Sequence, residues 1–366
     1  MARALELARR GQWTTWPNPM VGCVVVMNGR VVAQGWHRRW GGAHAEVDAL
    51  SQIPEHVDLG QATVFVTLEP CSHHGKTPPC ADLLIQRRVG RVVVAMHDPN
   101  PLVSGQGIAR LREAGISVEV GLRANDANAL NQRFCHAMRS PRPWVTLKWA
   151  QSHDGFMDPD PQAAFGRGSV SVSGAGTQRH THGLRATHDG ILVGLRTLLV
   201  DEPSLTTRRV PGRDPKRLVW TQGQTMPPAT WRPTEAGDFP PHFGTLVHPS
   251  SANASVLEAW RAMGWATCPV DGEVGSIEWW TSMRLQTGLQ AVLVEGGAAL
   301  HDLMLSGDGW DEIHRYTSAK CLNDGLNGPT VPSHAALVHG PATLDEDTLE
   351  VWRHPRHLDE FCQRGD

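Results

Sequence analysis

The sequence predicts an α/β protein with two domains, and three observations lead to this fold class. The chain has 366 residues, more than a single domain usually contains. Short β-branched runs alternate with helical stretches, a pattern typical of a partly parallel sheet with helices on both faces. Two prolines among polar residues in Arg139-Ser140-Pro141-Arg142-Pro143 indicate a linker. We therefore expect one domain over residues 1–140 and a second over residues 144–366.

The elements of the first domain can be placed in order along the chain. Residues 1–10 have the pattern of an amphipathic helix. Strands at 22–27 and 30–34 are joined by Asn28-Gly29, a strong signal for a two-residue hairpin turn. The other β-branched runs predict strands at 63–67, 91–96 and 117–120, and the remaining stretches predict helices at 45–51, 80–88, 107–114 and 124–138.

The most informative motif of the chain lies between His44 and Cys80. His44-Ala45-Glu46 is followed by Pro70-Cys71-Ser72-His73-His74-Gly75-Lys76-Thr77-Pro78-Pro79-Cys80. One imidazole and two thiolates leave the fourth position of a tetrahedral zinc ion free for water, as in catalytic sites. Zinc lowers the pKa of bound water from about 15.7 to near 7, so that hydroxide can attack an amino-substituted carbon. Zinc deaminases work in this way, with a carboxylate such as that of Glu46 moving the protons.

The local sequence around these ligands is consistent with such a site. Residues two apart on an ideal helix point in nearly opposite directions, so we expect His44 and Glu46 in an irregular first turn after Gly41-Gly42. Pro78-Pro79 predicts a helix that starts at Cys80, where free N–H groups favour a thiolate.

Two other interpretations of the motif stay open. Isolated histidines and cysteines are usually ordinary side chains and free thiols, so the spacing could be fortuitous. A closed structural zinc site would need a fourth ligand, for which His37, His73 and His74 are candidates. The closed site leaves the placement of Glu46 unexplained.

Composition and charge argue against several classes of partner. A net charge of −3 and a pI near 6.7 give no basic surface for nucleic acid. Seven cysteines without a framework pattern fit a reducing cytosol. Residues 1–10 lack the apolar run of a signal peptide, and no stretch approaches the roughly 20 apolar residues of a membrane span. We therefore expect a cytoplasmic protein without nucleic-acid or membrane partners.

Residues 15–104 closely resemble the deaminase half of the bifunctional riboflavin-biosynthesis deaminase/reductase, the RibD family. Eight residues separate Cys71 from Cys80, whereas cytidine and tRNA-adenosine deaminases place two residues between their paired cysteines. The matching stretches are Pro17-Asn18-Pro19-Met20-Val21-Gly22-Cys23-Val24, Gly35-Trp36-His37, His44-Ala45-Glu46, the block at 67–80 and Asp98-Pro99-Asn100-Pro101.

This resemblance implies a cytidine-deaminase-like three-layer domain with a mixed sheet. It assigns Lys76 and Thr77 to the phosphorylated ribose of the substrate. Asn18 would orient the pyrimidine ring through its side-chain amide, although an asparagine that only satisfies the turn between Pro17 and Pro19 is an equally good interpretation of the sequence.

The second half resembles the reductase half of the same family, a dihydrofolate-reductase-like α/β domain that binds NADPH. The resemblance rests on a strand from Trp144 that runs into a turn at Gly155, on Leu184-Arg185-Ala186-Thr187-His188-Asp189-Gly190-Ile191-Leu192-Val193-Gly194, on the segment 197–208 and on Val294-Glu295-Gly296-Gly297. The two glycines before a helical stretch offer bare backbone N–H groups, which suit a phosphate.

The residues of the reductase half follow from this resemblance position by position. Arg185 and Arg208 would clamp a substrate phosphate, with two solvated surface arginines as the alternative. Lys148 and Asp201 are candidates for polar assistance at the sugar. The predicted substrate contacts are Ser169, Arg185, Leu205, Arg208 and Glu295, and the predicted cofactor contacts are Ala150, Ser171, Thr197, Asp201 and Gly297.

The sequence therefore predicts a two-step enzyme of riboflavin biosynthesis that acts on small phosphoribosylaminopyrimidines and forms a homo-oligomer. With one zinc ion and Glu46, it would hydrolytically deaminate 2,5-diamino-6-(5-phosphoribosylamino)pyrimidin-4(3H)-one. With NADPH, it would then reduce the ribosyl chain to ribityl. One alternative is a nucleic-acid base deaminase with an unrelated second domain. The other is a non-catalytic scaffold stabilised by zinc, or a deaminase whose reductase-like domain has become a binding or structural module.

Overall fold

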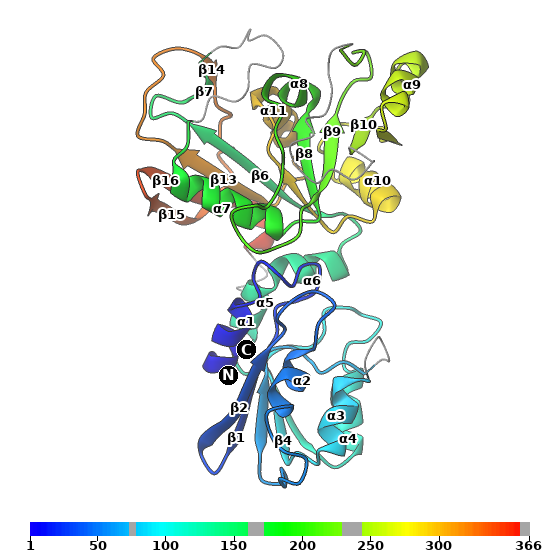
Figure 1. Ribbon diagram of the computed structural model, residues 1–366, viewed down its shortest axis with the longest axis vertical. Coiled ribbons are helices and arrows are strands. Elements are labelled where there is room, and N and C mark those ends of the chain that lie inside the picture. Colours follow the sequence, from blue (N-terminus) through cyan, green and yellow to red (C-terminus); the bar gives the residue numbers. More distant parts are fainter. Residues whose placement is uncertain (73–77, 160–171, 229–243, 359–366) are drawn as a thin grey trace. The chain divides into compact units, whose positions relative to one another are not determined.

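The computed structural model describes residues 1–72, 78–159, 172–228 and 244–358 (Figure 1). The chain divides into two compact units, Met1–Ser140 and Pro141–Asp366. Four of the predicted site residues, Lys76, Thr77, Ser169 and Ser171, lie outside the described residues, as do His73 and His74.

A five-stranded mixed sheet with strand order β2-β1-β3-β4-β5 forms the centre of the first unit. β1 (Gly22–Met27) pairs antiparallel with β2 (Arg30–Trp36) and with β3 (Thr63–Val66). β3, β4 (Arg91–Val94) and β5 (Ser117–Val120) run parallel. Asn28 and Gly29 have φ angles of 52° and 74°, the left-handed conformation that a two-residue hairpin turn requires, so the predicted turn is confirmed.

Helices cover both faces of this sheet, which confirms the predicted three layers. α1 (Ala2–Arg9) packs on one face so closely that a Cβ atom on Gly22 would lie 1.9 Å from the Ala4 carbonyl oxygen. On the other face a Cβ atom on Gly35 would lie 2.4 Å from the Ala49 backbone nitrogen. Only glycine permits these approaches. The second face is covered by α2 (Ala45–Leu50), α3 (Cys80–Gln86) and α4 (Gln106–Glu113).

The last helical stretch of the first unit is divided in two. α5 (Ala124–Leu130) and α6 (Gln132–Arg139) are separated at Asn131, whose φ and ψ are −110° and 25°. The Asn131 amide accepts a hydrogen bond from the Met20 N–H group and donates one to the Met20 carbonyl, each over 2.8 Å. The prediction of one helix over 124–138 was therefore wrong, because the side-chain bonds to Met20 hold Asn131 away from helical dihedral angles. The Asn131 backbone groups still hydrogen-bond to Ala127 and Cys135.

The second unit contains a larger, mainly parallel sheet with strand order β11-β10-β9-β8-β12-β6-β13-β16-β15. The strands from β11 to β13 run parallel, and β16 and β15 continue the sheet in antiparallel fashion. Their bounds are β6 (Trp144–Gln151), β8 (Gly190–Gly194), β9 (Lys216–Trp220), β10 (Thr245–His248), β11 (Ala266–Pro269), β12 (Ala291–Val294), β13 (Glu312–Thr317), β15 (Ala336–Leu344) and β16 (Asp347–Arg353). β7 (Phe156–Asp158) and β14 (Leu326–Asn327) pair separately.

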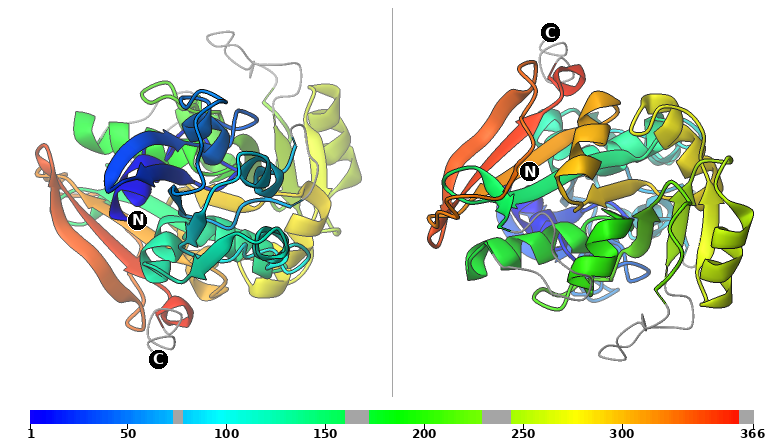
Figure 2. Two further views of the ribbon diagram at one scale, coloured as in Figure 1. Left: turned by 90° about the horizontal axis from the view of Figure 1, so that it is seen from below. Right: turned by 90° about the horizontal axis from the view of Figure 1, so that it is seen from above.

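Both faces of the larger sheet are buried beneath helices (Figure 2). Successive residues of β8 point to opposite layers: Ile191 and Val193 join one apolar cluster, and Leu192 joins the other. Such continuous apolar strands are typical of parallel sheets covered on both sides. One layer holds α7 (Ala175–Ala186), α8 (Leu195–Asp201) and α9 (Ala254–Ala262), and the other holds α10 (Ile277–Thr287) and α11 (Ala298–Ser306). A 3₁₀ turn, η1 (Pro355–His357), follows β16.

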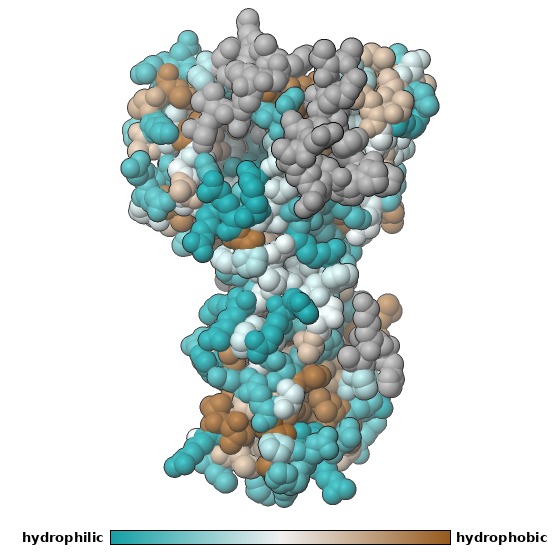
Figure 3. Space-filling model, in the orientation of Figure 1, coloured by the Kyte–Doolittle hydropathy of each residue, from teal (hydrophilic) through white to brown (hydrophobic). Residues whose placement is uncertain are grey.

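The surface of the first unit includes an apolar patch on the β1–β2 hairpin (Figure 3). Val31 and Val32 of the edge strand β2 are both exposed there. Among the described residues, no helix combines the length and the apolar character needed to cross a membrane.

Candidate functional site

The three predicted zinc ligands lie together in the first unit. His44 Nδ1 is 3.3 Å from Cys80 Sγ and 3.5 Å from Cys71 Sγ, and all three ligand atoms lie within 4.8 Å of one another. Zinc bonds of about 2.0 Å to nitrogen and 2.3 Å to sulfur in a tetrahedron would separate the ligand atoms by roughly 3.5 to 3.8 Å. The donor set and its spacing therefore fit a zinc ion with little rearrangement.

Secondary-structure ends position each of these ligands. His44 is the N-cap of α2 and has extended backbone dihedrals. The direction of its side chain is therefore not set by the helical geometry that places Glu46. Cys80 is the first residue of α3, and its N–H group donates to Cys71 Sγ over 3.2 Å. Free N–H groups at a helix start favour a thiolate, as the sequence led us to expect.

The two thiols differ in acidity because they share one proton. Hydrogen bonding from the Cys80 thiol, with a further contribution from His44, lowers the pKa of Cys71 to about 4. Donation to Cys71 raises the pKa of Cys80 well above its ordinary value. A divalent cation between the sulfur atoms would remove this competition and release the second proton.

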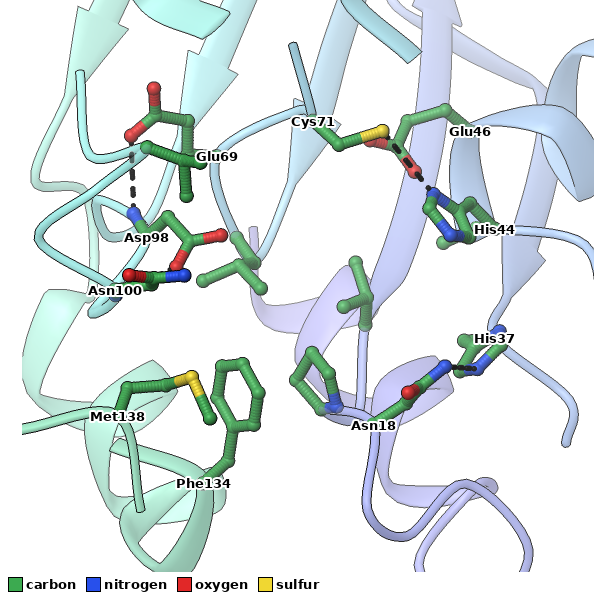
Figure 4. Close-up of a pocket in the computed structure, with 15 residues that line it drawn as sticks. Asn18, His37, His44, Glu46, Glu69, Cys71, Asp98, Asn100, Phe134 and Met138 are labelled. Atoms are coloured by element: carbon green, nitrogen blue, oxygen red, sulfur yellow. Dashed lines mark hydrogen bonds between the residues drawn. The ribbon is translucent and has the colours of Figure 1, made fainter. Parts of the chain in front are cut away.

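Glu46 lies beside this cluster at the start of α2 (Figure 4). The residue is only 4% exposed, and this burial raises the pKa of its carboxyl group to about 7. A group that must accept and release a proton near neutral pH works best with a pKa in this range. A bound cation would lower the pKa again, by favouring the carboxylate.

The cluster opens into a cavity whose other walls come from distant segments (Figure 4). Asn18 and His37 line it near the ligands. Asp98 and Asn100 lie on the wall across from His44, and Phe134 and Met138 of α6 add an apolar surface. The sequence motifs contained Asp98 and Asn100 without suggesting a role for them, and no local signal pointed to α6.

His37 does not belong to the ligand cluster. Its Nδ1 atom is 2.9 Å from the Ala43 carbonyl oxygen, and its Nε2 atom is 3.2 Å from Asn18 Nδ2. Burial lowers the pKa of His37. Both ring nitrogens are therefore engaged with protein groups, which argues against His37 as the fourth ligand of a closed site.

Glu69 is a structural residue of this cavity that sequence reasoning missed. Its buried carboxylate accepts four backbone hydrogen bonds, two of them from the N-cap glycine and the second residue of α4. These bonds tie the loop that carries Asp98 and Asn100 to the end of β3. The donors are the N–H groups of Asp98, Gly105, Gly107 and Ile108, at 3.1, 2.9, 2.9 and 3.3 Å.

In the second unit, Arg185 of α7 pairs with Glu295 after β12. The Arg185 Nε and Nη2 atoms donate to the two carboxylate oxygens, each over 2.8 Å, and Nη1 donates to the Thr206 carbonyl over 3.0 Å. Burial opposes ionisation, but Arg185 outweighs it and lowers the pKa of Glu295 to about 2. Three nitrogen atoms of the Arg185 guanidinium thus already form hydrogen bonds within the protein, which leaves little of the group available to a phosphate.

Arg208, the other predicted phosphate ligand, is exposed. Its Nη1 atom lies 2.5 Å from Ser204 Oγ and 3.0 Å from Thr206 Oγ1. Nearby, burial and the charges of Arg185 and Arg208 lower the pKa of His182 to about 4. This excess of positive charge suits an anionic substrate group.

Lys148 of β6 lies on the face of the sheet that α7 covers. Burial lowers its pKa, and the nearby Glu295 carboxylate partly compensates. The Nζ atom lies 5.5 Å from the centre of the Tyr316 ring. The structure therefore brings together Lys148, Arg185 and Glu295, which come from three separate segments.

Two predicted cofactor residues, Ala150 and Gly297, lie at or just after the carboxyl ends of the parallel strands β6 and β12. Gly297 caps α11, and its N–H group donates to Thr197 Oγ1 over 3.2 Å. The expectation of a bare N–H group was therefore wrong at Gly297, because a threonine from α8 already accepts its hydrogen bond. A Cβ atom on Gly297 would meet only that oxygen, at 3.6 Å, so the turn leaves room for a ligand. Ala150 lies in β6 opposite Tyr316, and Asp201 ends α8.

A cleft beside this turn is lined by residues of β8, α8, β9 and α11, the position where open α/β sheets bind nucleotides. These residues include Gly194, Arg196, Trp220, Gln222, Ala299 and Leu300. Leu205, a predicted substrate contact, is buried with a φ of 54°, a conformation that costs a leucine free energy. The turn at Gly297 leaves room for a ligand, and none of the predicted cofactor contacts among the described residues lines the cleft itself.

Comparisons with known protein families match both units. Residues 1–96 match the cytidine and deoxycytidylate deaminase zinc-binding region, and residues 143–339 match the RibD C-terminal domain. The riboflavin biosynthesis protein RibD of Bacillus amyloliquefaciens is 38% identical over 91% of this chain and 87% of its own length. The RibD protein of Actinobacillus pleuropneumoniae is 35% identical over 88% of this chain and 83% of its own length.

Solved structures show the same likeness over both units. Acinetobacter baumannii RibD has a TM-score of 0.79 and 31% identity, covering 96% of this chain and 97% of that one. The diaminohydroxyphosphoribosylaminopyrimidine deaminase/5-amino-6-(5-phosphoribosylamino)uracil reductase of Thermotoga maritima has a TM-score of 0.77 and 32% identity, covering 97% of both chains. Nothing in these matches favours a deaminase joined to a decayed reductase.

Proposed function

Because the chain belongs to the RibD family, we propose that its two units perform successive reactions on one phosphorylated pyrimidine. It is a bifunctional enzyme of riboflavin biosynthesis, with a deaminase and a reductase activity. The first reaction would remove the 2-amino group of 2,5-diamino-6-(5-phosphoribosylamino)pyrimidin-4(3H)-one. The second would reduce the ribosyl chain of the product to ribityl.

In the deaminase unit, His44, Cys71 and Cys80 would hold a zinc ion, which supplies an activated water molecule when bound. Glu46 takes a proton from the attacking water and delivers it to the amino group, which leaves as ammonia. Asn18 orients the pyrimidine ring, and Phe134 offers it an apolar surface. Lys76 and Thr77 are proposed to bind the ribose phosphate.

In the reductase unit, Thr197 and Gly297 would hold NADPH, which supplies a hydride when bound. Ala150, Ser171 and Asp201 are the other proposed cofactor contacts. Lys148, with its pKa lowered by burial, can give a proton to the sugar oxygen that is released as the ring opens. The proposed substrate contacts are Ser169, Arg185, Leu205, Arg208 and Glu295, of which Arg208 is the exposed cation for the phosphate.

The observation that carries the proposal is the cluster of three candidate zinc ligands beside the buried Glu46 carboxyl group. His44, Cys71 and Glu46 also line one cavity. A coupled assay with the diaminopyrimidine phosphate tests both steps. We expect release of one ammonia per substrate, followed by loss of NADPH absorbance. Ammonia release without NADPH oxidation would reject the second reaction, and no ammonia release by zinc-loaded enzyme would reject the first.

That the enzyme is a cytoplasmic homo-oligomer stays a prediction. Light scattering on the purified full chain would measure its subunit number.

A further inference from the structure

We propose that His37 is a positioning residue that turns the Asn18 amide oxygen toward the deaminase cavity, where this oxygen accepts a hydrogen bond from a ring N–H of the substrate. The inference builds on the proposed deamination and adds a reason for substrate selection.

The position of the proton on His37 follows from its partner at Nδ1. The Ala43 carbonyl oxygen, 2.9 Å away, can only accept a hydrogen bond. Nδ1 must therefore carry the proton, and the neutral ring then has a lone pair at Nε2. A doubly protonated ring would place a charge on a side chain that is 3% exposed, with its centre 5.9 Å from that of the His44 ring.

The lone pair at Nε2 determines how the Asn18 amide is turned. Asn18 Nδ2 lies 3.2 Å from Nε2 and donates to it. The reversed amide would set its oxygen against this lone pair, two acceptors facing each other, so the network selects one orientation. Figure 4 shows the Asn18 nitrogen facing His37 and the oxygen turned toward the space between Asn18 and Phe134.

An acceptor fixed at this place selects a particular class of ring. Asn18 lines the same cavity as His44 and Glu46, so its oxygen can meet a ring whose amino-bearing carbon is held at the zinc ligands. An aminopyrimidinone with a 3H tautomer has an N–H beside that carbon, which complements the Asn18 oxygen. A cytosine-type ring presents a lone pair there and would be repelled, which leaves a buried acceptor unsatisfied.

A double-mutant cycle tests whether His37 acts through Asn18. We expect His37→Ala to keep zinc and raise the deamination KM about 10-fold, the usual value of one hydrogen bond. In an Asn18→Ala background the same change should alter KM less than about twofold, because its target is gone. His56→Ala, at an exposed position of the same unit, is the matched control and should leave KM unchanged.

Conservative variants separate positioning from general structural support. His37→Gln can still offer an acceptor to the Asn18 amide and should recover most of the loss. The asparagine side chain of His37→Asn is shorter and keeps only the hydrogen bond to the Ala43 carbonyl. This variant should not recover the lost activity. An N3-methylated substrate analogue should compete poorly with substrate for wild-type enzyme, and this discrimination should shrink in Asn18→Ala.

A nitrogen-15 NMR spectrum of the zinc-loaded wild-type enzyme gives a readout that does not depend on turnover. We expect His37 as the neutral tautomer protonated at Nδ1. A proton on Nε2, equal effects of His37→Ala in both backgrounds, or zinc loss in His37→Ala would overturn the inference. If wild-type enzyme released no ammonia while the tautomer was as expected, the proposed deamination would fail and the orientation of Asn18 would stand.

Discussion

Each unit contains a buried glutamate at its candidate active site, and the two carboxyl groups behave in opposite ways. Among the described residues, the side chains that act on the Glu46 carboxyl group are His44, Cys71 and Cys80, and burial raises its pKa to about 7. The Glu295 side chain is also largely enclosed, yet the bidentate Arg185 lowers its pKa to about 2 against the effect of burial. The partner, and not burial alone, decides whether a carboxyl group can move protons or acts as a permanent charge.

The difference suggests a division of labour between the two units. A proton-moving Glu46 suits hydrolysis, in which water must lose protons and ammonia must gain them. The permanently charged Glu295 instead holds Arg185 in place and influences Lys148, so orientation and charge dominate in the reductase unit. Substitutions in the deaminase unit should therefore affect mainly the rate of deamination, and substitutions in the reductase unit should affect mainly stability and substrate binding.

The largest effect should follow loss of a zinc ligand. Cys71→Ser or Cys80→Ser should remove most of the zinc and abolish deamination, because the remaining ligands hold the ion weakly. Reduction of an already deaminated substrate should continue, since the second unit has its own core. Metal analysis that found one full zinc equivalent in both variants would refute the ligand set.

Replacing the proton-moving carboxylate should come next. Glu46→Gln should keep its zinc but lose deamination by about 10²- to 10⁴-fold, the usual range for a general acid–base group. Zinc content, ammonia release and reductase activity should be measured on the same preparation. Normal ammonia release by a zinc-loaded variant would show that Glu46 does not move the protons.

The Arg185–Glu295 pair should make the stability of the second unit depend on acid. The folded-state pKa of Glu295 is about 2, below the ordinary 4.5, so the pair stabilises the fold above pH 4.5 and this contribution is lost as the pH falls toward 2. A difference of this size corresponds to on the order of 3 kcal/mol. Denaturant unfolding of the full chain at several pH values would measure it.

Glu295→Gln should remove this acid dependence and lower the free energy of unfolding at neutral pH by a similar amount. Glu350→Gln provides a matched control in the same unit, because its pair with Arg315 is more exposed and should contribute less than about 1 kcal/mol. Equal changes in the free energy of unfolding for the two substitutions would show that the enclosed pair stabilises the fold no more than the exposed one.

The smallest expected effect concerns the exposed arginine. Arg208→Ala should raise the reductase KM for phosphorylated substrate by about 10- to 100-fold, the value of a charge-assisted pair of roughly 1.5 to 3 kcal/mol. Arg208→Lys should recover part of this, because an ammonium lacks the planar fork of a guanidinium. NADPH affinity and deamination should stay nearly unchanged. If Arg208→Ala instead weakened NADPH binding alone, Arg208 would contact the cofactor.

Local features of the deaminase unit could be predicted because short sequence patterns encode them. The Asn28-Gly29 turn, the hairpin around it and the start of α3 at Cys80 each depend on the conformations open to a few consecutive residues. The pairing of His44 with two cysteines was also readable, because zinc demands particular side chains and the spacing between the two motifs is typical of one family.

Contacts between distant segments could not be predicted in this way. The Asn131 side chain binds the Met20 backbone, Arg185 binds Glu295, and Glu69 accepts hydrogen bonds from four N–H groups of residues 98–108. Nothing near any of these residues in the sequence indicates its partner. Each pairing depends on the order of strands in a sheet and on which layer a helix covers.

The sequence by itself therefore determined the class of each unit, the three candidate zinc ligands and the carboxylate beside them. The tertiary structure decided how the side chains are used: which glutamate pairs with an arginine, which arginine is enclosed, and which carbonyl group His37 faces. The physical reason is that protonation and hydrogen-bond direction depend on burial and on the nearest charges. Those surroundings exist only once segments far apart in the chain have packed together.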